Sequence, residues 1–163
     1  GNNWRYHDYR DSSIHNYLPA AEEMVRRGFY AIRMGHTVKE SLSVKQQKII
    51  DYATKYRNDF MDIYLISKCR FAILAHCGLK HVAIIFRTPV VCVNVIRHMG
   101  LLYLTSRDIC IPKNLWLKKE KRFMKFKEIF NSGVANFGAT DQYENYGVEI
   151  IENSPEEIKA VAI

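Results

Sequence analysis

The apolar residues of this chain fall into short runs that polar, helix-capping and glycine positions separate. Asn58 precedes a helical pattern and can cap it, and Phe71–Ala75 follows as an unbroken apolar run. Gly78 opens a second helical segment that ends at Arg87, and Val90–Val95 is again apolar apart from Asn94. Such runs are typical of strands buried on both faces of a parallel sheet. The stretch therefore predicts a helix, a strand, a helix and a strand in succession.

The flanking sequence continues this alternation of helix and strand. A helical pattern over Tyr17–Arg27 stops at Gly28, a last helix begins at Pro155, and a long loop is predicted over 131–146. Strands are predicted at 29–34, 48–52, 70–75, 89–95 and 147–151, with a weaker one at 101–105. We expect the first five to lie parallel in one sheet. The predicted fold class is α/β: an open, mostly parallel Rossmann-like sheet with helices on both faces, a three-layer α/β/α arrangement.

Length and composition indicate one folded domain. The chain has 163 residues, of which 48% are apolar and 25% charged, as is ordinary for a globular protein. No internal repeat or linker interrupts it, so residues 1–163 are predicted to form a single Rossmann-like domain. Gly1–Asn3 resembles a fragment boundary, and few residues follow the helix start at Pro155. We therefore expect the chain to be the C-terminal half of a longer two-domain protein.

Several classes of site are excluded or disfavoured by missing motifs. The four cysteines Cys69, Cys77, Cys92 and Cys110 form no CxxC pair and have no histidines at zinc spacing, which predicts reduced thiols and no metal site. The chain has no GxxxxGK[ST], GxGxxG or GxSxG motif, which disfavours a P-loop NTPase, a dinucleotide oxidoreductase and an α/β-hydrolase. No DxD-like pair follows a predicted strand, which disfavours a metal-dependent transferase. A cytoplasmic location is expected.

Positive charge is concentrated in one segment. Lys113–Glu128 holds seven basic and two acidic residues, a net +5 out of +7 for the whole chain. Phe123, Phe126 and Phe130 recur at helical spacing, which predicts an amphipathic helix with its apolar side inward. Two interpretations stay open: the lysines solvate a helix face, or they attract anionic lipid headgroups or a phosphorylated donor.

Candidate ligand-binding residues follow the predicted strands. Ligands of open parallel sheets bind beyond the carboxyl ends of the strands, where helix N-termini also point. Arg33 and Gly35 close the 29–34 strand, and a guanidinium followed by glycine suits phosphate or carboxylate recognition; the alternative is a surface arginine paired with an acid. His76 and Cys77 lie between a buried strand and the helix that starts at Gly78. An activated Cys77 thiolate is an alternative without a supporting signature.

Other polar residues are candidates through their place on predicted helices or loops. Asp59 and Asp62 lie one turn apart at a helix start, where Asp59 suits capping and Asp62 suits a ligand hydroxyl or a buried contact. His81 lies one turn beyond Gly78 and is expected to face the same cleft. Arg10 lies in a loop near the start of the chain and is a further candidate for a ligand contact.

Short motifs spread over nearly the whole chain carry a resemblance to a known family. They are Tyr6-His-Asp-Tyr-Arg10, Tyr17-Leu-Pro19, Tyr30-Ala-Ile-Arg-Met-Gly35, Asp59-Phe-Met-Asp62, Ser67-Lys-Cys-Arg70, Gly78-Leu79, Thr88-Pro-Val-Val91, Ile111-Pro-Lys113 and Asn153-Ser-Pro-Glu-Glu157. In this order they resemble a family of bacterial proteins assigned as glycosyltransferases of surface-polysaccharide synthesis. The family tends to have small hydroxyl residues before the turn glycine, whereas this chain has Ala75, His76 and Cys77.

The resemblance implies the C-terminal, nucleotide-sugar-binding half of a metal-independent GT-B-type transferase. In such enzymes the donor lies between two Rossmann-like domains. The implied partners are a nucleotide-sugar donor, a saccharide or lipid-linked acceptor and an N-terminal domain, with no cofactor besides the sugar nucleotide. The residues expected to bind the donor are Arg33, Gly35, Asp62, His76, Cys77, Gly78 and His81. This chain alone is not expected to turn over, because the catalytic base and acceptor site would come largely from the N-terminal domain.

The alternative function is a non-catalytic α/β interaction module. It would bind an anionic membrane or another polyanion through Lys113–Lys127, at the inner face of the cytoplasmic membrane. Nucleic acid is not expected as a partner, because aromatic residues do not interleave with basic ones in an RNA-binding pattern.

Overall fold

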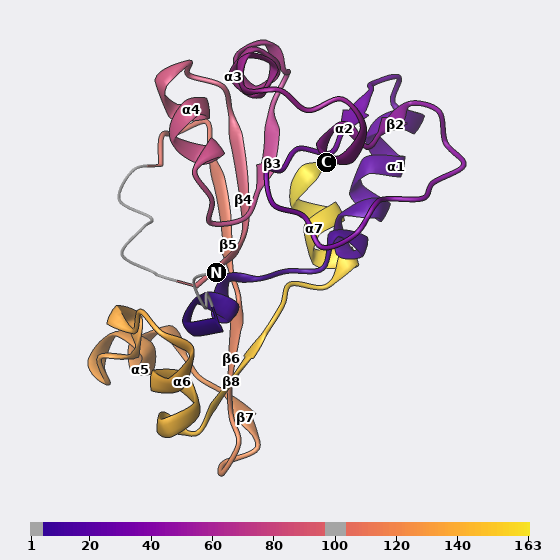
Figure 1. The fold of residues 1–163 in the computed structure, drawn as a ribbon. Helices are drawn as coiled ribbons and strands as arrows, with labels where there is room; N and C mark the ends of the chain where they lie inside the picture. The colour runs from indigo at the N-terminus through magenta and orange to yellow at the C-terminus, as the bar shows by residue number, and fades with distance from the viewer. Residues whose placement is uncertain (1–4, 97–103) are drawn as a thin grey trace. The chain divides into compact units, whose positions relative to one another are not determined.

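The computed structural model describes residues 5–96 and 104–163, and over these residues the chain is a mixed α/β protein with parallel strand pairs and seven α-helices (Figure 1). The weaker strand predicted at 101–105 falls largely outside them. The chain divides into two compact units. Within the described residues, unit 1 takes in the chain up to Ser12, Ile73–Cys77 and Val91–Asn153. Unit 2 takes in Ser13–Ala72, Gly78–Val90 and Ser154–Ile163.

Unit 2 is mostly helical around one short parallel strand pair. Its elements are η2 (Ile14–Tyr17), α1 (Leu18–Arg26), β1 (Ala31–Ile32), β2 (Ile49–Ile50), α2 (Tyr52–Lys55), α3 (Asp59–Lys68), α4 (Leu79–Ile85) and α7 (Pro155–Ala162). β1 and β2 pair in parallel, Ala31 with Ile49 and Ile32 with Ile50. The strands predicted at 29–34 and 48–52 are therefore present, although each is only two residues long.

Capping residues define the ends of three helices that the sequence predicted. Gly28, at φ +96°, ends α1 in a left-handed conformation that glycine adopts without steric cost. The Asn58 side chain accepts a hydrogen bond from the Met61 amide at 2.9 Å at the start of α3. Ser154 caps α7 by accepting from the Glu157 amide at 3.2 Å, and the Glu157 carboxylate closes a capping box. The predicted helix starts at Asn58 and Pro155 are confirmed.

The end of α4 is set by backbone geometry before a proline. Arg87 takes a left-handed φ of +56°, and its amide donates to the Ile84 carbonyl at 3.1 Å. The Thr88 amide donates to the Ala83 carbonyl at 2.9 Å, which completes a Schellman motif. Pro89 cannot continue the helix, so the predicted end of this helix is confirmed.

The first and last helices of unit 2 pack on each other. α1 contacts α7, and α7 also contacts η2. Ala20 and Met24 of α1 and Ile158 of α7 are buried. This contact buries one face of each amphipathic helix and anchors the C-terminal helix on the helix nearest the start of unit 2.

Unit 1 contains two three-stranded sheets together with short α- and 3-10 (η) helices. Its elements are η1 (Arg5–Arg10), β3 (Ala72–Leu74), β4 (Val90–Val95), β5 (Ile109–Pro112), β6 (Asn114–Leu117), β7 (Arg122–Phe123), α5 (Phe126–Asn131), η4 (Val134–Asn136), α6 (Thr140–Tyr146) and β8 (Val148–Ile151), where β3 and β4 each begin with one residue of unit 2. The first sheet has the order β3-β4-β5 and the second the order β7-β6-β8.

The first sheet contains the predicted buried strands. Every residue of β4 is buried, and all but Asn94 are apolar, as expected for a strand covered on both faces. β4 pairs in parallel with β5, and the register shifts between Cys92 and Val95. At that irregularity Asn94 has a left-handed φ of +55°. The strands predicted at 70–75 and 89–95 are confirmed.

The prediction of one parallel sheet of five strands is wrong. The strands expected at 29–34, 48–52, 70–75 and 89–95 fall into two separate sheets. The strand expected at 147–151 is present as β8 but pairs antiparallel with β6, with Leu115 opposite Ile150. The partner of β8 is β6, a strand that the sequence did not predict.

The amphipathic helix predicted through Phe123, Phe126 and Phe130 is present only as α5, and its phenylalanines are exposed and do not face inward. The basic segment forms β6, a turn and β7, and only Phe126–Asn131 is helical. β6 forms backbone hydrogen bonds with both β7 and β8. Because β8 lies far from β6 in sequence, the residues around β6 give no local sign that this segment is a strand. The long loop predicted over 131–146 is wrong too, because it contains η4 and α6.

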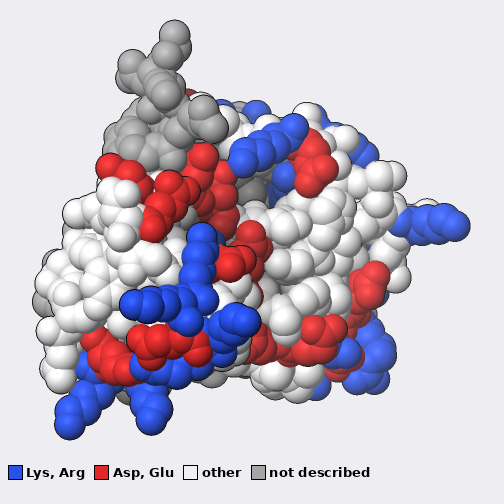
Figure 2. Space-filling model, turned by 90° about the horizontal axis from the view of Figure 1, so that it is seen from below, with Lys and Arg blue, Asp and Glu red and all other residues white. Residues whose placement is uncertain are grey.

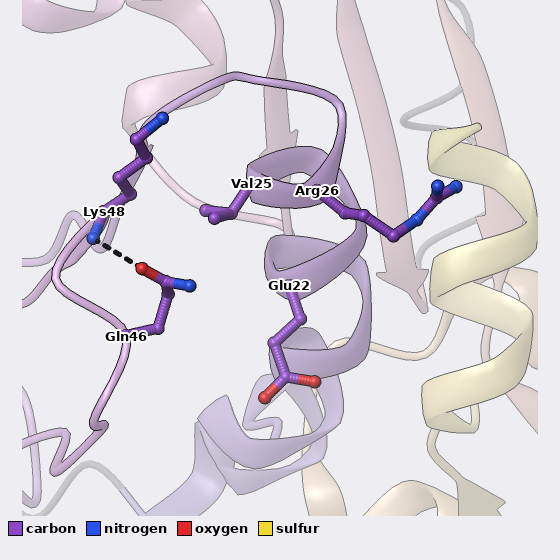
Figure 3. A pocket seen from close by; sticks show the side chains of 5 residues that line it. All are labelled: Glu22, Val25, Arg26, Gln46 and Lys48. Atoms are coloured by element: carbon purple, nitrogen blue, oxygen red, sulfur yellow. Dashed lines mark hydrogen bonds between the residues drawn. The ribbon is translucent and has the colours of Figure 1, made fainter.

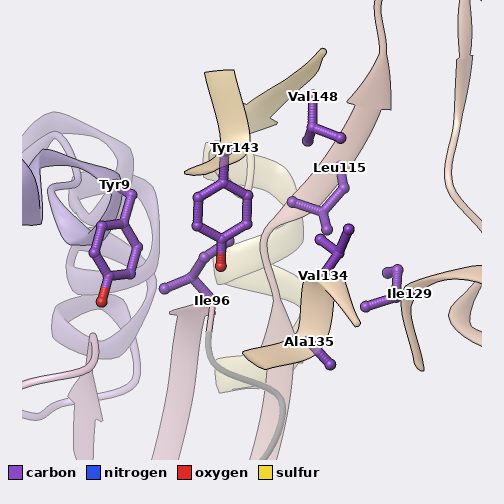
Figure 4. Packing of buried hydrophobic residues seen from close by; sticks show 8 residues of the cluster. All are labelled: Tyr9, Ile96, Leu115, Ile129, Val134, Ala135, Tyr143 and Val148. Atoms are coloured by element: carbon purple, nitrogen blue, oxygen red, sulfur yellow. The ribbon is translucent and has the colours of Figure 1, made fainter. Parts of the chain in front are cut away.

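The core of unit 1 lies where η1, α5, η4 and α6 meet the second sheet. Its buried members are Tyr9, Ile96, Leu115, Ile129, Val134, Ala135, Tyr143 and Val148 (Figure 4). Tyr143 is 1% exposed, and its ring centroid lies 5.7 Å from that of Tyr9 and 5.2 Å from that of Phe137. These aromatic contacts hold η1 against α6.

Two buried asparagines join three distant segments of unit 1. The Asn94 amide donates to Asn153 Oδ1 at 2.6 Å, and the Asn153 amide donates to Asn94 Oδ1 at 2.7 Å. Asn153 Nδ2 also donates to the Pro112 carbonyl at 2.8 Å. Asn94 is 0% exposed and Asn153 is 2% exposed. The pair therefore ties the ends of β4 and β5 to the chain after β8.

Asn153→Ala should lower the free energy of unfolding by about 2–4 kcal/mol, because it leaves the buried Asn94 amide and the Pro112 carbonyl without their partner. Urea unfolding of the variant and the parent measures this difference. The matched control is Asn131→Ala, at an exposed position on α5 of the same unit, which should change stability by less than about 0.5 kcal/mol. Equal losses in the two variants would contradict this role of Asn153.

Candidate functional site

Arg33 directly follows β1 and lies almost entirely out of solvent, with 7% of its side chain exposed. Its Nη1 donates to the Glu40 carbonyl at 2.8 Å and lies 3.4 Å from Asp51 Oδ1. Gly35 has φ +155°, and a Cβ there would lie 2.7 Å from Val38 Cγ1, so the backbone itself requires glycine. Arg33 is thus paired with an acid, the alternative that the sequence left open. An anion bound to Arg33 would compete with Asp51 for the guanidinium.

Asp51 is the counterion of Arg33 and directly follows β2. Its side chain is 1% exposed and accepts hydrogen bonds from the Leu42 amide at 2.7 Å and the Thr54 hydroxyl at 2.6 Å. Burial alone would raise the pKa of Asp51, but the bonds from Thr54 and Leu42 and the Arg33 charge lower it overall. The carboxylate is thus ionised at neutral pH, and it holds the loop at Leu42 against the end of β2.

Asp62 belongs to a second polar network, around Tyr52. Its Oδ1 lies 2.9 Å from the Tyr52 hydroxyl and its Oδ2 lies 3.0 Å from Arg57 Nη2. The same hydroxyl accepts from the Asn58 amide at 3.0 Å, and burial together with Asp62 raises the pKa of Tyr52. Asp59 also binds Arg57 but is 91% exposed. Of the two roles predicted for Asp62, the buried contact is present.

The two networks meet because Asp51 and Tyr52 are consecutive residues. Asp51 holds Arg33, and Tyr52 holds Asp62, at the carboxyl end of the β1–β2 pair. The structure therefore places three predicted site residues, Arg33, Gly35 and Asp62, around one strand edge of unit 2. Sequence reasoning missed Asp51, Tyr52 and Arg57. The available signal was an acid and a tyrosine directly after two isoleucines at the end of a predicted strand.

The loop from Ala75 to Gly78 connects β3 to α4, as the sequence predicts. His76 is half-buried, and Cys77, Gly78 and His81 are exposed. Gly78 has ordinary helical angles, and a Cβ there would meet no atom within 4 Å. His76 and Cys77 belong to unit 1, whereas Gly78 and His81 belong to unit 2. A shared site of His76 with Arg33 and Asp62 stays a prediction.

Arg10 lies in unit 1 beside a buried lysine. Its Nε donates to the Tyr9 hydroxyl at 2.9 Å, and its guanidinium carbon lies 5.2 Å from the centroid of the Tyr9 ring. The Lys113 ammonium donates to the carbonyls of Tyr9, at 3.1 Å, and of Asp11. Burial lowers the pKa of Lys113, against the opposing charges of Glu152 and Asp11. Lys113 therefore holds the segment that carries Arg10.

Lys113 does not contribute to the basic surface predicted over Lys113–Lys127, because this residue is only 4% exposed. Arg122 on β7 forms two bonds to the Glu128 carboxylate, at 2.9 and 2.7 Å, and its Nε donates to Glu120 at 2.6 Å. The bonds from Arg122 and from the Lys125 amide lower the pKa of Glu128 to about 2. The remaining lysines of the segment are exposed.

A cavity of about 550 Å³ lies between α1 and the chain that leads into β2. Its lining residues are Glu22, Val25, Arg26, Gln46 and Lys48 (Figure 3). The Lys48 amide donates to Gln46 Oε1 at 3.2 Å. Lys48 precedes β2, whereas Asp51 follows it, so this cavity and the Arg33–Asp62 edge lie at opposite ends of the strand. No predicted site residue lines the cavity.

The described part of the chain contains no group of three His, Cys, Asp or Glu side chains that could hold a metal ion. The four cysteines are free thiols, and burial raises the pKa of Cys69. Among the helices over residues 5–96 and 104–163, none combines the length and the apolar character that crossing a membrane requires.

Comparison with known proteins found no family model, no curated protein and no solved structure that matches this chain.

Asp51→Ala should destabilise the protein by about 3 kcal/mol, because it leaves the Arg33 guanidinium buried without its counterion and removes the acceptor of the Leu42 amide. Urea unfolding tests this expectation. Asp59→Ala is the matched control: its carboxylate is 91% exposed, and the loss should stay below about 1 kcal/mol. A cost for Asp51→Ala as small as that of the control would show that the buried ion pair does not support unit 2.

Glu128→Gln should reduce the acid sensitivity of the fold. The folded-state pKa of Glu128, about 2, lies below its ordinary value of 4.5, so its stabilisation is fully present above 4.5 and is lost as pH falls toward 2. Glutamine does not titrate, so the variant cannot lose this stabilisation as pH falls. Its urea midpoint of unfolding should therefore drop less than that of the parent between about pH 5.5 and pH 3. Glu144→Gln, at an exposed site on α6, should keep the parental pH response. The same response in all three proteins would refute the assignment.

Proposed function

We propose that this chain is the nucleotide-sugar donor-binding domain of a metal-independent GT-B-type glycosyltransferase of cell-surface polysaccharide synthesis. The proposal starts from the ordered motifs that resemble that family. The strongest support is that Arg33 pairs with Asp51 and Asp62 bonds to the adjacent Tyr52, at the carboxyl end of a parallel strand pair. Open parallel sheets bind their ligands at such an edge.

Other motifs of the resemblance also have structural partners in unit 1. Lys113 of one motif bonds to the carbonyl of Tyr9 in another, and Asn153 of a third bonds to the Pro112 carbonyl. Segments that resemble the family at positions far apart in sequence thus contact one another. These contacts are compatible with a fold of the family type.

The donor would dock its phosphates at the loop before α4. Gly78 leaves open space where a side chain would otherwise stand, so phosphate oxygens can approach the backbone amides there. Asp51 partly neutralises the Arg33 guanidinium, so Arg33 would offer the donor phosphates only the remaining part of its positive charge. His76, Cys77 and His81 would contact the sugar or the diphosphate. The catalytic base and the acceptor site belong to a second domain, so this chain binds the donor without transferring the sugar, and it acts in the cytoplasm at the inner face of the membrane.

A nucleoside diphosphate such as UDP or GDP, at ten times its dissociation constant, should raise the free energy of unfolding by about 1.4 kcal/mol. Gly78→Val should abolish this gain, because the added side chain fills the space that the phosphate needs, while the fold has room for it. Thermal unfolding with and without nucleotide measures both effects.

The matched control for this test is Gly138→Val, at another glycine whose added Cβ would meet nothing within 4 Å. It should keep the nucleotide-dependent gain. Nucleotide stabilisation that survives Gly78→Val, or its absence from the parent for both nucleotides, would refute the donor-site assignment. Arg33→Ala is a poorer probe, since it would also leave Asp51 buried without its counterion.

A further inference from the structure

Three exposed phenylalanines lie in the segment that forms β7 and α5. Phe123 is 51% exposed, Phe126 59% and Phe130 51%. Phe126 and Phe130 are four residues apart on α5, so their side chains share one face of the helix. Phe123 packs its ring edge-on against Trp116, with the centroids 4.9 Å apart. A short stretch of chain thus presents three large apolar side chains to solvent. Where such side chains form a contiguous patch, they mark an interaction surface.

The same segment carries a positive charge that its own acids do not neutralise. Within Lys118–Phe130 there are five lysines, one arginine and two glutamates, a net charge of +4. Both glutamates form ion pairs with Arg122, so these two ion pairs do not neutralise the lysines of the segment. Lys118, Lys119, Lys121, Lys125 and Lys127 are exposed. Figure 2, seen from below the view of Figure 1, shows Lys and Arg side chains interspersed with Asp and Glu side chains.

The backbone holds these side chains in a defined arrangement. Arg122 on β7 clamps the first turn of α5 through its two bonds to Glu128, and the Lys125 amide donates to the same carboxylate at 2.7 Å. Leu117 pairs with Arg122 across the β6–β7 turn, where Lys121 takes a left-handed φ of +53°. Phe123 and Phe126 are therefore presented from one ordered corner.

We propose that this corner, formed by Phe123, Phe126, Phe130 and the five exposed lysines and here called the Phe–Lys corner, docks on an anionic lipid bilayer. The phenylalanines enter the boundary between headgroups and acyl chains, and the lysines reach the lipid phosphates on flexible stems. Each lysine near such a surface strengthens binding about fivefold, and the buried rings add an apolar contribution that does not depend on salt.

Lipid fits this corner better than nucleic acid does. Single-stranded nucleic acid binds where aromatic rings line a groove or a sheet face and offer flat stacking surfaces, often beside arginine. Here two of the rings project from a helix, the third packs edge-on against Trp116, and both acids of the segment occupy its arginine. The Phe–Lys corner is independent of the donor site, so either assignment can fail alone.

The test is co-sedimentation of the full chain with vesicles of phosphatidylcholine containing about 30% phosphatidylglycerol, against vesicles of phosphatidylcholine alone. We expect binding to the anionic vesicles, with affinity falling as salt rises, and at most weak binding to the neutral ones. The triple variant Lys118→Gln, Lys119→Gln, Lys121→Gln should lower the partition coefficient about a hundredfold. Phe126→Gln with Phe130→Gln should lower it at least about tenfold at any salt concentration.

Matched controls come from unit 2. Phe60→Gln removes a phenylalanine that is 72% exposed on α3, and a triple change of Lys45, Lys55 and Lys68 to glutamine removes as many exposed lysines. Both controls should bind anionic vesicles as the parent does, and every variant should keep the parental circular dichroism spectrum. Absence of binding to anionic vesicles, equal losses in controls and corner variants, or tighter binding to a single-stranded oligonucleotide than to vesicles would each overturn the proposal.

Discussion

Burial forces polar side chains of this protein into pairs, and the fold depends on those pairs. The amides and side chains of Asn94 and Asn153 bond reciprocally in a site closed to solvent. An unpaired polar group in such a place costs more than the pair gains, so β4 and the chain after β8 must meet in one register. Hydrophobic contacts alone would allow neighbouring registers; the amide pair selects one.

The same constraint operates on ions in both units. Asp51 of unit 2 and Lys113 of unit 1 are each almost fully buried, and each has its charge met by groups from another part of the chain. Burial raises the pKa of Asp51 and lowers that of Lys113. The pKa of Asp51 is nevertheless lowered, because its partners outweigh desolvation, whereas that of Lys113 is lowered because desolvation outweighs its partners. Lys113 has neutral carbonyls as its hydrogen-bond acceptors, which explains the difference.

Local features of the fold were predictable because their causes are local. Asn58, Ser154 and Gly28 act through neighbouring amides and carbonyls, and the largely apolar sequence of β4 matches its burial on both faces. The β6–β7 turn was not predictable, because the pairing of β6 with β8 joins residues far apart in sequence. The helical spacing of Phe123, Phe126 and Phe130 placed these side chains in a core, yet all three are exposed. For the candidate site, the sequence indicated Arg33 and Asp62 but not Asp51 and Tyr52, which hold them.

The left-handed backbone at Asn94 restricts which amino acids this position can accept. Glycine would adopt the conformation but offers no acceptor to the Asn153 amide, and aspartate would offer one at the cost of a buried charge. Branched residues are excluded by the backbone itself. A strand whose other positions need only a fitting apolar side chain thus contains one position whose chemical identity is nearly unique. A related chain that had replaced it would have to build the end of this strand differently.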